Sequence, residues 1–371
     1  MLKKFTVTNF KNFGSTVTLD LGDPSNYEFN SNIVRCGIVT KGMVYGINGS
    51  GKSNLGLALF DIVLHLTDKE KLWVKYLPYL HLGSPKTTVD FEYVFDFDGV
   101  ELIYRYAKTD PMSLCHESLF INGQELLAYD FQQHSGYTKL AGSENMQLSS
   151  PLSTEADGLS RVKYVKSNAI LQDTPENRAF VAFTSFVDSM LLFFSLDGNG
   201  YQGFTFGSES YTQAIIRQGR VQEFEAFLRK YDIDYKLEVG FINGQEELFC
   251  VMGEDRVQFT MLASTGTRSL ALFYYWYLSM ERASFVYIDE YDAFYHFELA
   301  QSLVELLREL KGPQIFLSTH NTDLLSNDIL RPDAYFVIES NRILPLDKLT
   351  DKALRQAHNL QKMYKAGSFH G

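Results

Sequence analysis

The clearest chemical feature of the sequence is a loop with the residues and spacing of a phosphate cradle. Gly46-Ile47-Asn48-Gly49-Ser50-Gly51-Lys52-Ser53 fits the pattern G-x-x-x-x-G-K-[ST] and lies between an apolar run and a helical stretch. Its glycines let successive backbone N–H groups turn toward phosphate oxygens, and the dipole of the following helix adds positive potential. These features predict that the loop binds a nucleotide.

The side chains of this loop have separate expected roles. Lys52 would reach the β- and γ-phosphates of ATP, and the hydroxyl of Ser53 would ligate Mg²⁺. The alternative is a Gly/Ser-rich turn that carries a lysine by chance, and the strand before the loop and the apolar helix after it argue against that. The predicted contacts to ATP come from Asn48, Gly49, Ser50, Gly51, Lys52, Ser53 and Asn54.

A pair of carboxylates ends a second apolar run. Phe285-Val286-Tyr287-Ile288 is followed by Asp289 and Glu290. Read alone, such a pair is a solvated strand edge at least as often as a catalytic one. In a chain with a phosphate loop it has the form of a Walker B element, in which Asp289 holds Mg²⁺ directly or through water and Glu290 orients and polarises the attacking water. We therefore expect Glu290 to be catalytic and Asp289 to be a metal ligand.

A histidine follows the next apolar run. Gln314–Ser318 has the pattern of a buried strand, and His320 comes shortly after it, one helix-strand unit beyond Glu290. The carboxyl ends of neighbouring parallel strands meet at one edge of a sheet, which would bring His320 close to the γ-phosphate. A histidine there can donate to the phosphoryl group and report its loss. The predicted catalytic residues are therefore Lys52, Glu290 and His320.

Small residues precede a long helical stretch that starts near Thr267. Ala263-Ser264-Thr265-Gly266-Thr267 would place free N–H groups at a helix N-terminus, which forms an anion site. The same residues also suit an ordinary helix cap with no ligand. Their place between the phosphate loop and the Asp-Glu pair favours nucleotide binding by Ser264 and Gly266.

The elements that must position these residues follow from the periodicity. From Thr267 onward, helical stretches at Thr267–Glu281 and Phe297–Lys311 alternate with continuous apolar runs, and a further run covers Tyr335–Ile338. This alternation indicates an α/β fold with a mixed or parallel core sheet covered on both faces. The first part of the chain alternates with a period of two, which predicts an opening hairpin (Phe5–Phe10 with Thr16–Leu21) and an antiparallel lobe (Thr88–Phe95 with Leu102–Tyr106).

The middle of the chain predicts an inserted region. A polar loop rich in Ser and Gly covers Gln132–Gly158 and precedes two helical stretches. The expected division is 1–70 for the hairpin and the phosphate loop, 71–255 for an inserted β-rich and helical lobe, 256–346 for the part with Ser264, the Asp-Glu pair and His320, and 347–371 for a basic C-terminal helix or tail. The expected elements of the middle are helices at Pro175–Phe194 and Tyr211–Tyr231 and strands at Lys236–Phe241, Glu247–Val251 and Val257–Met261.

Composition limits the class of protein. The 371 residues are 45% hydrophobic and carry a net charge of −11, which allows a substantial core and does not indicate a nucleic-acid surface, although a local basic groove would allow one. The three cysteines are far apart and lack metal-ligand spacing. The N-terminus lacks the apolar core of a signal peptide, and no apolar run approaches about 18 residues. We expect a soluble, cytoplasmic protein with no membrane partner.

The order of these motifs resembles the ATPase head of ABC-type proteins, including the SMC and RecF families, and the details resemble a compact group of bacterial AAA-family ATPases with ABC-type heads. In this resemblance Ser264–Thr267 corresponds to the signature of ABC-type heads, and it departs from the signature of transporters and SMC proteins, which have glycine where this chain has Thr265. The matching segments are Phe5–Phe13, Gly46–Ser53, Ser264–Thr267, Asp289-Glu290-x-Asp292 with His296, and Thr319–Leu325, and the candidates for the Q-loop glutamine are Gln132, Gln133 and Gln172.

The resemblance implies a site shared between two copies of the chain. In ABC-type heads the signature serine and its helix contact the γ-phosphate bound by the other subunit, so the resemblance implies a homodimer or higher homo-oligomer with ATP and Mg²⁺, and places Asp292 near the seam. Many members of this group are encoded beside a nuclease or another toxic effector in phage-defence operons. The resemblance therefore implies a switch, driven by ATP hydrolysis, for a separately encoded effector.

Two other functions remain open at the level of the sequence. A RecF-like DNA-repair ATPase needs a local basic groove, for which Arg217, Arg220, Arg229 and Lys230 are the candidates. A non-hydrolytic scaffold would hold ATP and only assemble partners. Salt-dependent binding to duplex DNA would support the first, and a wild-type chain without steady-state turnover would support the second.

Overall fold

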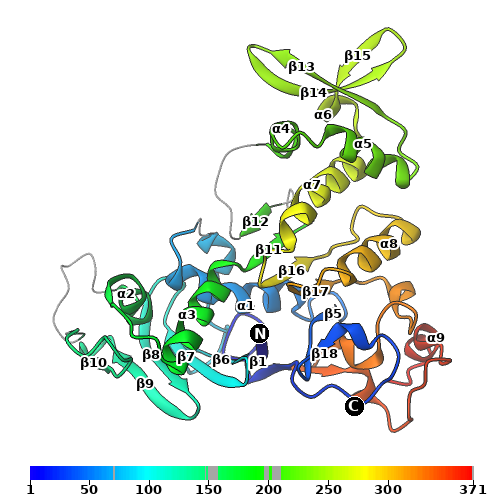
Figure 1. Cartoon of the computed structure of the whole chain (residues 1–371). Coiled ribbons are helices and arrows are strands. Elements are labelled where there is room, and N and C mark those ends of the chain that lie inside the picture. The colour runs from blue at the N-terminus through cyan, green and yellow to red at the C-terminus, as the bar shows by residue number, and fades with distance from the viewer. Residues whose placement is uncertain (70–71, 147, 149–157, 196–199, 203–209, 370–371) are drawn as a thin grey trace.

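A mostly parallel, seven-stranded sheet forms the centre of the computed structural model (Figure 1). The structure describes residues 1–69, 72–146, 148, 158–195, 200–202 and 210–369. Within these residues the inner strands of the sheet run parallel, and an antiparallel strand closes each edge. In spatial order the strands are β12 (Gly200–Gln202), β11 (Leu191–Phe194), β16 (Phe285–Asp289), β17 (Gln314–Ser318), β5 (Lys41–Tyr45), β18 (Tyr335–Glu339) and β19 (Arg342–Pro345).

The inner strands of this core sheet are deeply buried. Every residue of β5, β16 and β17 is buried, as expected for continuous apolar strands of a parallel sheet. The helix after the phosphate loop, α1 (Lys52–Leu66), packs closely on β16, because a Cβ atom on Gly56 would lie 2.8 Å from the ring of Tyr287. The predicted α/β fold with a mixed or parallel core sheet is confirmed.

The predicted helix over Pro175–Phe194 is wrong at its C-terminal end. α3 (Pro175–Asp188) stops before Ser189, and Leu191–Phe194 forms β11, which pairs in parallel with β16. A short apolar run at the end of a helical pattern has no period that separates strand from helix, and here pairing in the sheet decides. The consequence is that the carboxyl end of β11 lies beside Asp289.

The predicted helix over Tyr211–Tyr231 is two helices that lead to a small sheet. The turn between them contains Gly219 with a φ of +67°, a left-handed conformation that glycine adopts readily. The predicted strand over Val257–Met261 ends at Gln258, where a short helix begins. These elements, at the top of Figure 1, are α4 (Tyr211–Arg217), α5 (Val221–Lys230), β13 (Lys236–Ile242), β14 (Gln245–Met252), β15 (Asp255–Gln258) and α6 (Phe259–Leu262).

A second seven-stranded sheet is antiparallel and contains the predicted opening hairpin. β1 pairs with β2 on one side and with β6 on the other, so strands from residues 1–70 and from 71–255 share one sheet. The division at residues 70, 255 and 346 stays a prediction. In spatial order the strands are β10 (Ser135–Thr138), β9 (Gln124–Asp130), β8 (Leu114–Ile121), β7 (Val100–Lys108), β6 (Val89–Phe97), β1 (Leu2–Thr8) and β2 (Val17–Asp20).

The remaining elements connect these sheets. α7 (Thr265–Met280) runs from the small β13–β15 sheet to the core sheet (Figure 1). The predicted polar loop over Gln132–Gly158 contains β10, while its residues 147 and 149–157 lie outside the described residues. The other elements are β3 (Val34–Arg35), β4 (Ile38–Val39), α2 (Arg161–Asn168), α8 (Phe297–Arg308), α9 (Leu360–Lys365) and five short 3₁₀ turns within the described residues (Ser31–Ile33, Trp73–Tyr76, Thr322–Leu324, Pro332–Ala334 and Leu346–Leu349).

Two further properties limit what the fold can do. In the described part of the chain, no helix has both the length and the apolar character needed to cross a bilayer.

Cys36, Cys115 and Cys250 are all free thiols. Burial raises the pKa of the Cys250 thiol to about 11, so this thiol stays protonated near neutral pH and is unreactive.

Lys41 is a buried cation at the amino end of β5 and makes stability depend on pH. Its Nζ donates a hydrogen bond of 2.6 Å to the carbonyl oxygen of Pro313, and burial lowers its pKa from 10.5 to about 8. The folded chain therefore binds fewer protons than the unfolded chain between these two values, and the free energy of unfolding rises with pH across that window by about 3 kcal/mol for this group. Lys41→Met should remove that rise in denaturant unfolding at pH 8 and pH 10, and an unchanged rise would contradict the assignment.

Candidate functional site

A cavity of about 410 Å³ lies between the phosphate loop and the carboxyl ends of β16 and β17. The loop and the first turn of α1 form one wall, and residues that follow the two strands form the other. The fold thus brings together predicted site residues that are far apart in the sequence. The cavity is lined by Asn48, Gly49, Gly51, Lys52, Ser53, Asn54, Glu290 and His320.

The three predicted catalytic residues meet at this cavity. The Nζ atom of Lys52 lies 2.7 Å from Nε2 of His320 and 3.7 Å from Oε1 of Glu290. Nε2 of His320 is in turn 3.1 Å from the same carboxylate oxygen. A neutral imidazole nitrogen either accepts a hydrogen bond from Lys52 or donates one to Glu290, so the three side chains form one cluster whose protons are arranged together.

Lys52 is held tightly although it is a cation. Only 4% of the residue is exposed, and its Nζ donates a 3.1 Å hydrogen bond to the carbonyl oxygen of Gly46. Burial lowers its pKa, and the nearby carboxylates of Glu290 and Asp289 oppose that effect. The hydroxyl of Tyr287 donates a 2.8 Å hydrogen bond to the carbonyl oxygen of Lys52, which fixes the start of α1 against β16. A poorly hydrated cation in this position interacts strongly with an incoming anion.

Glu290 has an unusual backbone conformation. Its φ is +49°, a left-handed value that costs a residue with a Cβ about 1 kcal/mol or more. Its N–H donates a 2.8 Å hydrogen bond to Oγ of Ser318, the last residue of β17. This contact helps to hold the turn that places the Glu290 carboxylate at the cavity instead of leaving it on a solvated strand edge.

Asp289 is buried and does not itself line the cavity. Its Oδ1 accepts a 2.6 Å hydrogen bond from Oγ of Ser318, the same hydroxyl that accepts from the N–H of Glu290. Ser53 lines the cavity. Hydroxyl and carboxylate oxygens are suitable ligands for Mg²⁺, which takes its remaining ligands from phosphate and water, so the chemistry of Ser53 and Asp289 suits a magnesium-nucleotide site, and the role of Asp289 as a ligand stays a prediction. Among the described residues, no cluster of three or more His, Cys, Asp or Glu side chains forms a metal site by itself.

The opening hairpin supports the phosphate loop through a residue that sequence reasoning missed. Asn12, between β1 and β2, donates a 3.0 Å hydrogen bond from Nδ2 to the carbonyl oxygen of Ser50. Its Oδ1 accepts a 2.7 Å hydrogen bond from Nδ2 of Asn54. The sequence carries no local signal for this contact, because hairpin and phosphate loop meet only in the folded chain.

A family model, described as an AAA domain, putative AbiEii toxin of a type IV toxin-antitoxin system, matches residues 43–326. The chain belongs to this AAA domain family. The family match confirms the predicted AAA-family assignment, and the sheet order places the phosphate loop between β5 and α1, as the sequence predicts. No curated protein sequence matches the chain.

Several solved structures are similar to this AAA protein. An SMC head domain from Thermotoga maritima is 17% identical, with a TM-score of 0.47 over 93% of this chain and 98% of that chain. An SMC head with an extended coiled coil, bound to the C-terminal domain of ScpA derived from Pyrococcus furiosus, is 14% identical, with a TM-score of 0.42 over 94% and 97% of the two chains. The recombination mediator protein RecF with ATP is 14% identical, with a TM-score of 0.40 over 93% and 98%.

The predicted signature residues of the AAA domain lie outside the cavity around Lys52. Ser264 is the N-cap of α7, and its Oγ accepts a 3.1 Å hydrogen bond from the N–H of Thr267. Neither Ser264 nor Gly266 lines the cavity of their own chain. The helix-capping role is therefore present, and a role of these two residues in nucleotide binding stays a prediction that requires a phosphate from another copy.

Asp292 links the two loops that follow β16 and β17. Burial raises the pKa of its carboxyl group, and hydrogen bonds from the side chains of Thr319 and Asn321 act in the opposite direction. The hydroxyl of Tyr45 also donates a 3.2 Å hydrogen bond to the backbone carbonyl oxygen of Asn321. The loops that carry Glu290 and His320 are thus tied to each other and to the strand before the phosphate loop.

Other sequence candidates lie outside the cavity. Gln132, Gln133 and Gln172 do not line it, so the structure does not assign any of them as the Q-loop ligand.

Two of the cations proposed for a DNA surface are paired with acids. Nη1 of Arg220 lies 2.6 Å from Oε2 of Glu223. Nη2 of Arg229 lies 2.8 Å from Oε1 of Glu225, and its Nε lies 3.4 Å from Oδ1 of Asp234. These ion pairs reduce the positive potential that DNA binding needs.

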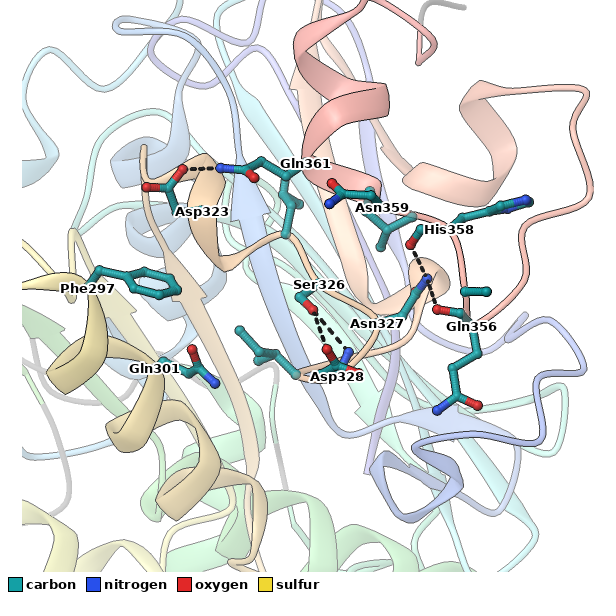
Figure 2. Close-up of a pocket in the computed structure, with 14 residues that line it drawn as sticks. Phe297, Gln301, Asp323, Ser326, Asn327, Asp328, Gln356, His358, Asn359 and Gln361 are labelled. Atoms are coloured by element: carbon teal, nitrogen blue, oxygen red, sulfur yellow. Dashed lines mark hydrogen bonds between the residues drawn. The ribbon is translucent and has the colours of Figure 1, made fainter.

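A second cavity, of about 440 Å³, contains no residue of the phosphate loop (Figure 2). The start of α8, the chain from Asp323 to Ile329 and the segment before α9 form its walls. Asn327 is buried between the last two walls, and its Nδ2 donates to the carbonyl oxygens of Arg355, Gln356 and His358 at 3.1, 3.2 and 3.0 Å. These bonds hold the C-terminal segment against the loop that follows His320.

Proposed function

We propose that this chain is a Mg²⁺-dependent ATPase that dimerises on ATP and acts as a nucleotide-dependent switch for a separate effector in anti-phage defence. The observation that carries the hydrolytic part is the meeting of Lys52, Glu290 and His320 in one cavity beside the phosphate loop. A carboxylate can orient an attacking water and accept its proton, and an imidazole can donate a hydrogen bond to a phosphoryl oxygen, so this set of residues suits ATP hydrolysis. Phosphate release from Mg-ATP by the purified chain tests this, and bound nucleotide without turnover would favour a non-hydrolytic scaffold.

The contacts within the cavity suggest how the residues would act on ATP. Lys52 now bonds to His320 and the Gly46 carbonyl and lies near Glu290, and it would turn from them to the β- and γ-phosphates. Glu290 would then accept the proton of the attacking water. Nε2 of His320 would donate a hydrogen bond to the γ-phosphoryl group, whose loss on hydrolysis would release the histidine.

Magnesium would bind together with the nucleotide. Ser53 and Asp289 are the residues of this chain that would hold it, Asp289 directly or through water. When bound, Mg²⁺ neutralises the charge that develops on the phosphoryl oxygens. The Ser318 hydroxyl orients the Asp289 carboxylate by its 2.6 Å hydrogen bond, and so prepares one side of the site.

Dimerisation is supported by the position of the signature residues. Ser264 caps a helix of 16 residues whose N-terminus is an anion-binding feature, and the cavity of the same chain does not include it. A phosphate bound in a second copy would satisfy that N-terminus. ATP would then bridge two heads, and loss of the γ-phosphate would weaken the bridge.

Ser264→Arg should block this bridge without affecting the first binding step. The exposed position of Ser264 tolerates a larger side chain, but a guanidinium at the seam would clash with the opposing phosphate loop and its Lys52. We expect ATP binding to the monomer to change less than about threefold while the dimer is lost in light scattering. A dimer that persists in this variant would show that the signature role is misassigned.

The proposed effector is a separate protein whose activity the nucleotide state of this chain controls. The description of the family names a putative toxin of a toxin-antitoxin system, and the resemblance to defence-operon ATPases suggests an effector such as a nuclease on another chain. Co-purification of the untagged products of neighbouring genes, with and without ATP, tests for it. A partner that binds equally in both conditions would contradict the switch.

A further inference from the structure

The hairpin loop between β1 and β2 is anchored to three different parts of the molecule. Asn9 donates from Nδ2 to the carbonyl oxygens of Lys86 and Thr88 at 3.2 and 2.8 Å. Lys11 donates from Nζ to three carbonyl oxygens of the segment after α1, those of Lys75, Leu77 and Pro78, at 3.1 to 3.4 Å. The third anchor is Asn12, which contacts the phosphate loop. The anchors at Asn9 and Lys11 hold the hairpin loop in place independently of its contact with the phosphate loop.

Asn12 contacts the phosphate loop at the turn that must cradle a phosphate. Its Nδ2 donates to the Ser50 carbonyl and its Oδ1 accepts from Asn54, so one side chain joins the turn of the loop to the first turn of α1. The approach is close, because a Cβ atom on Gly51 would lie 2.5 Å from Nδ2 of Asn12. Gly51 also has a φ of +111°, which glycine tolerates best.

Asn12 acts from outside the cavity. It is half-buried and does not line the space around Lys52. A bound phosphate would therefore meet backbone N–H groups whose positions Asn12 fixes, without meeting Asn12 itself. A loop that is already in its binding conformation binds more tightly, because apparent affinity falls with the fraction of molecules in the competent state.

From these contacts we infer that Asn12 is a positioning residue that holds the phosphate loop in its nucleotide-binding conformation. The inference rests on the proposed nucleotide site. The supporting contacts reach the Ser50 and Asn54 part of the loop and avoid the Glu290 and His320 side. Asn12 therefore affects the binding of the diphosphate that ATP and ADP share, and it should change the affinities of the two nucleotides equally.

The test is the affinity of ADP and of a non-hydrolysable ATP analogue, measured by isothermal titration with the full chain. Asn12→Ala should weaken both by the same factor of about ten, the effect of a hydrogen bond of ordinary net strength. Asn12→Asp keeps the size and the acceptor for Asn54 but puts an oxygen against the Ser50 carbonyl, and should weaken both at least as much. Unchanged affinities in either variant would overturn the inference.

A double-mutant cycle and a stability control separate positioning from general destabilisation. Asn54 also lines the cavity, so Asn54→Ala alone removes more than its bond to Asn12. In the cycle, the double variant should lose less ADP affinity than the sum of the two single losses, because both changes remove the same shared hydrogen bond, and a strictly additive loss would overturn the coupling. Asn122→Ala removes a comparable side-chain acceptor in the β8–β9 turn, where Oδ1 of Asn122 accepts from the N–H of Glu101. It should lower the thermal midpoint without changing ADP affinity. Equal affinity losses at Asn12 and Asn122 would show a merely structural role.

The failure of this inference is distinguishable from failure of the proposed function. A wild-type chain that binds neither nucleotide overturns both. A wild-type chain that binds ADP but neither hydrolyses ATP nor dimerises overturns the proposed switch, and the Asn12 affinities still decide the inference.

Discussion

Replacing Glu290 with Gln should lower the rate of phosphate release from ATP by at least about 100-fold, the usual loss when a general base is removed. The amide keeps the size of the side chain and can still bond to His320, but it cannot take a proton from water. ATP binding should persist, because Lys52 and the backbone of the phosphate loop remain. It should even tighten, since Lys52 loses the anion that lies 3.7 Å from its Nζ in the nucleotide-free chain.

The measurement is a steady-state assay of phosphate release combined with an equilibrium titration of ATP. Glu298→Gln is the matched control, because Glu298 is an exposed residue in the first turn of α8 that does not line the cavity. It should leave both quantities unchanged. Turnover by Glu290→Gln at the wild-type rate would remove Glu290 from the mechanism and leave the Asp-Glu pair as a structural strand end.

Lys52→Ala should abolish measurable nucleotide binding, with a loss in affinity of at least about 100-fold. Among the described residues that line the cavity, Lys52 is the one lysine or arginine, so its removal leaves the phosphates with N–H groups and no opposing full charge from these residues. The same change leaves Glu290 and His320 facing the cavity without the cation that now lies between them and the Gly46 carbonyl.

Affinity for ATP and ADP, measured in the presence and absence of Mg²⁺, checks this. Lys86→Ala is a suitable control, since Lys86 is exposed, pairs with Asp90 and lies away from the cavity lining. Because Lys52 is buried, the circular dichroism spectrum and thermal midpoint of Lys52→Ala should be recorded with it. A folded variant that retains wild-type ATP affinity would contradict the assigned cradle.

Much of the site is predictable because its motifs are tied to local geometry. The phosphate loop needs a strand before it and a helix after it, and both are visible as patterns around Gly46 and Asn54. Glu290 and His320 each follow a continuous apolar run, and parallel strands necessarily present their carboxyl ends at one edge. The order of the elements therefore predicts that these residues lie close to Lys52.

The rest depends on contacts that no local pattern records. Leu191–Phe194 has the composition of a helix end or of a strand, and only pairing with β16 decides between them. Asn12 matters because the hairpin lies against the phosphate loop, and the role of Ser318 appears only when β17 lies beside β16. The position of Ser264 outside the cavity is likewise visible only in the folded chain.

The most direct test of the composite, ATP-bridged site is the mass of Glu290→Gln in solution, measured by sedimentation with Mg²⁺ and either ATP or ADP. Slow turnover should hold the bridge in place, so the proposal predicts a species of about twice the 42.4 kDa of one chain with ATP and a single chain with ADP. The dimer should disappear when Ser264→Arg is added. A mass that is the same with ATP and ADP would contradict the ATP-bridged dimer.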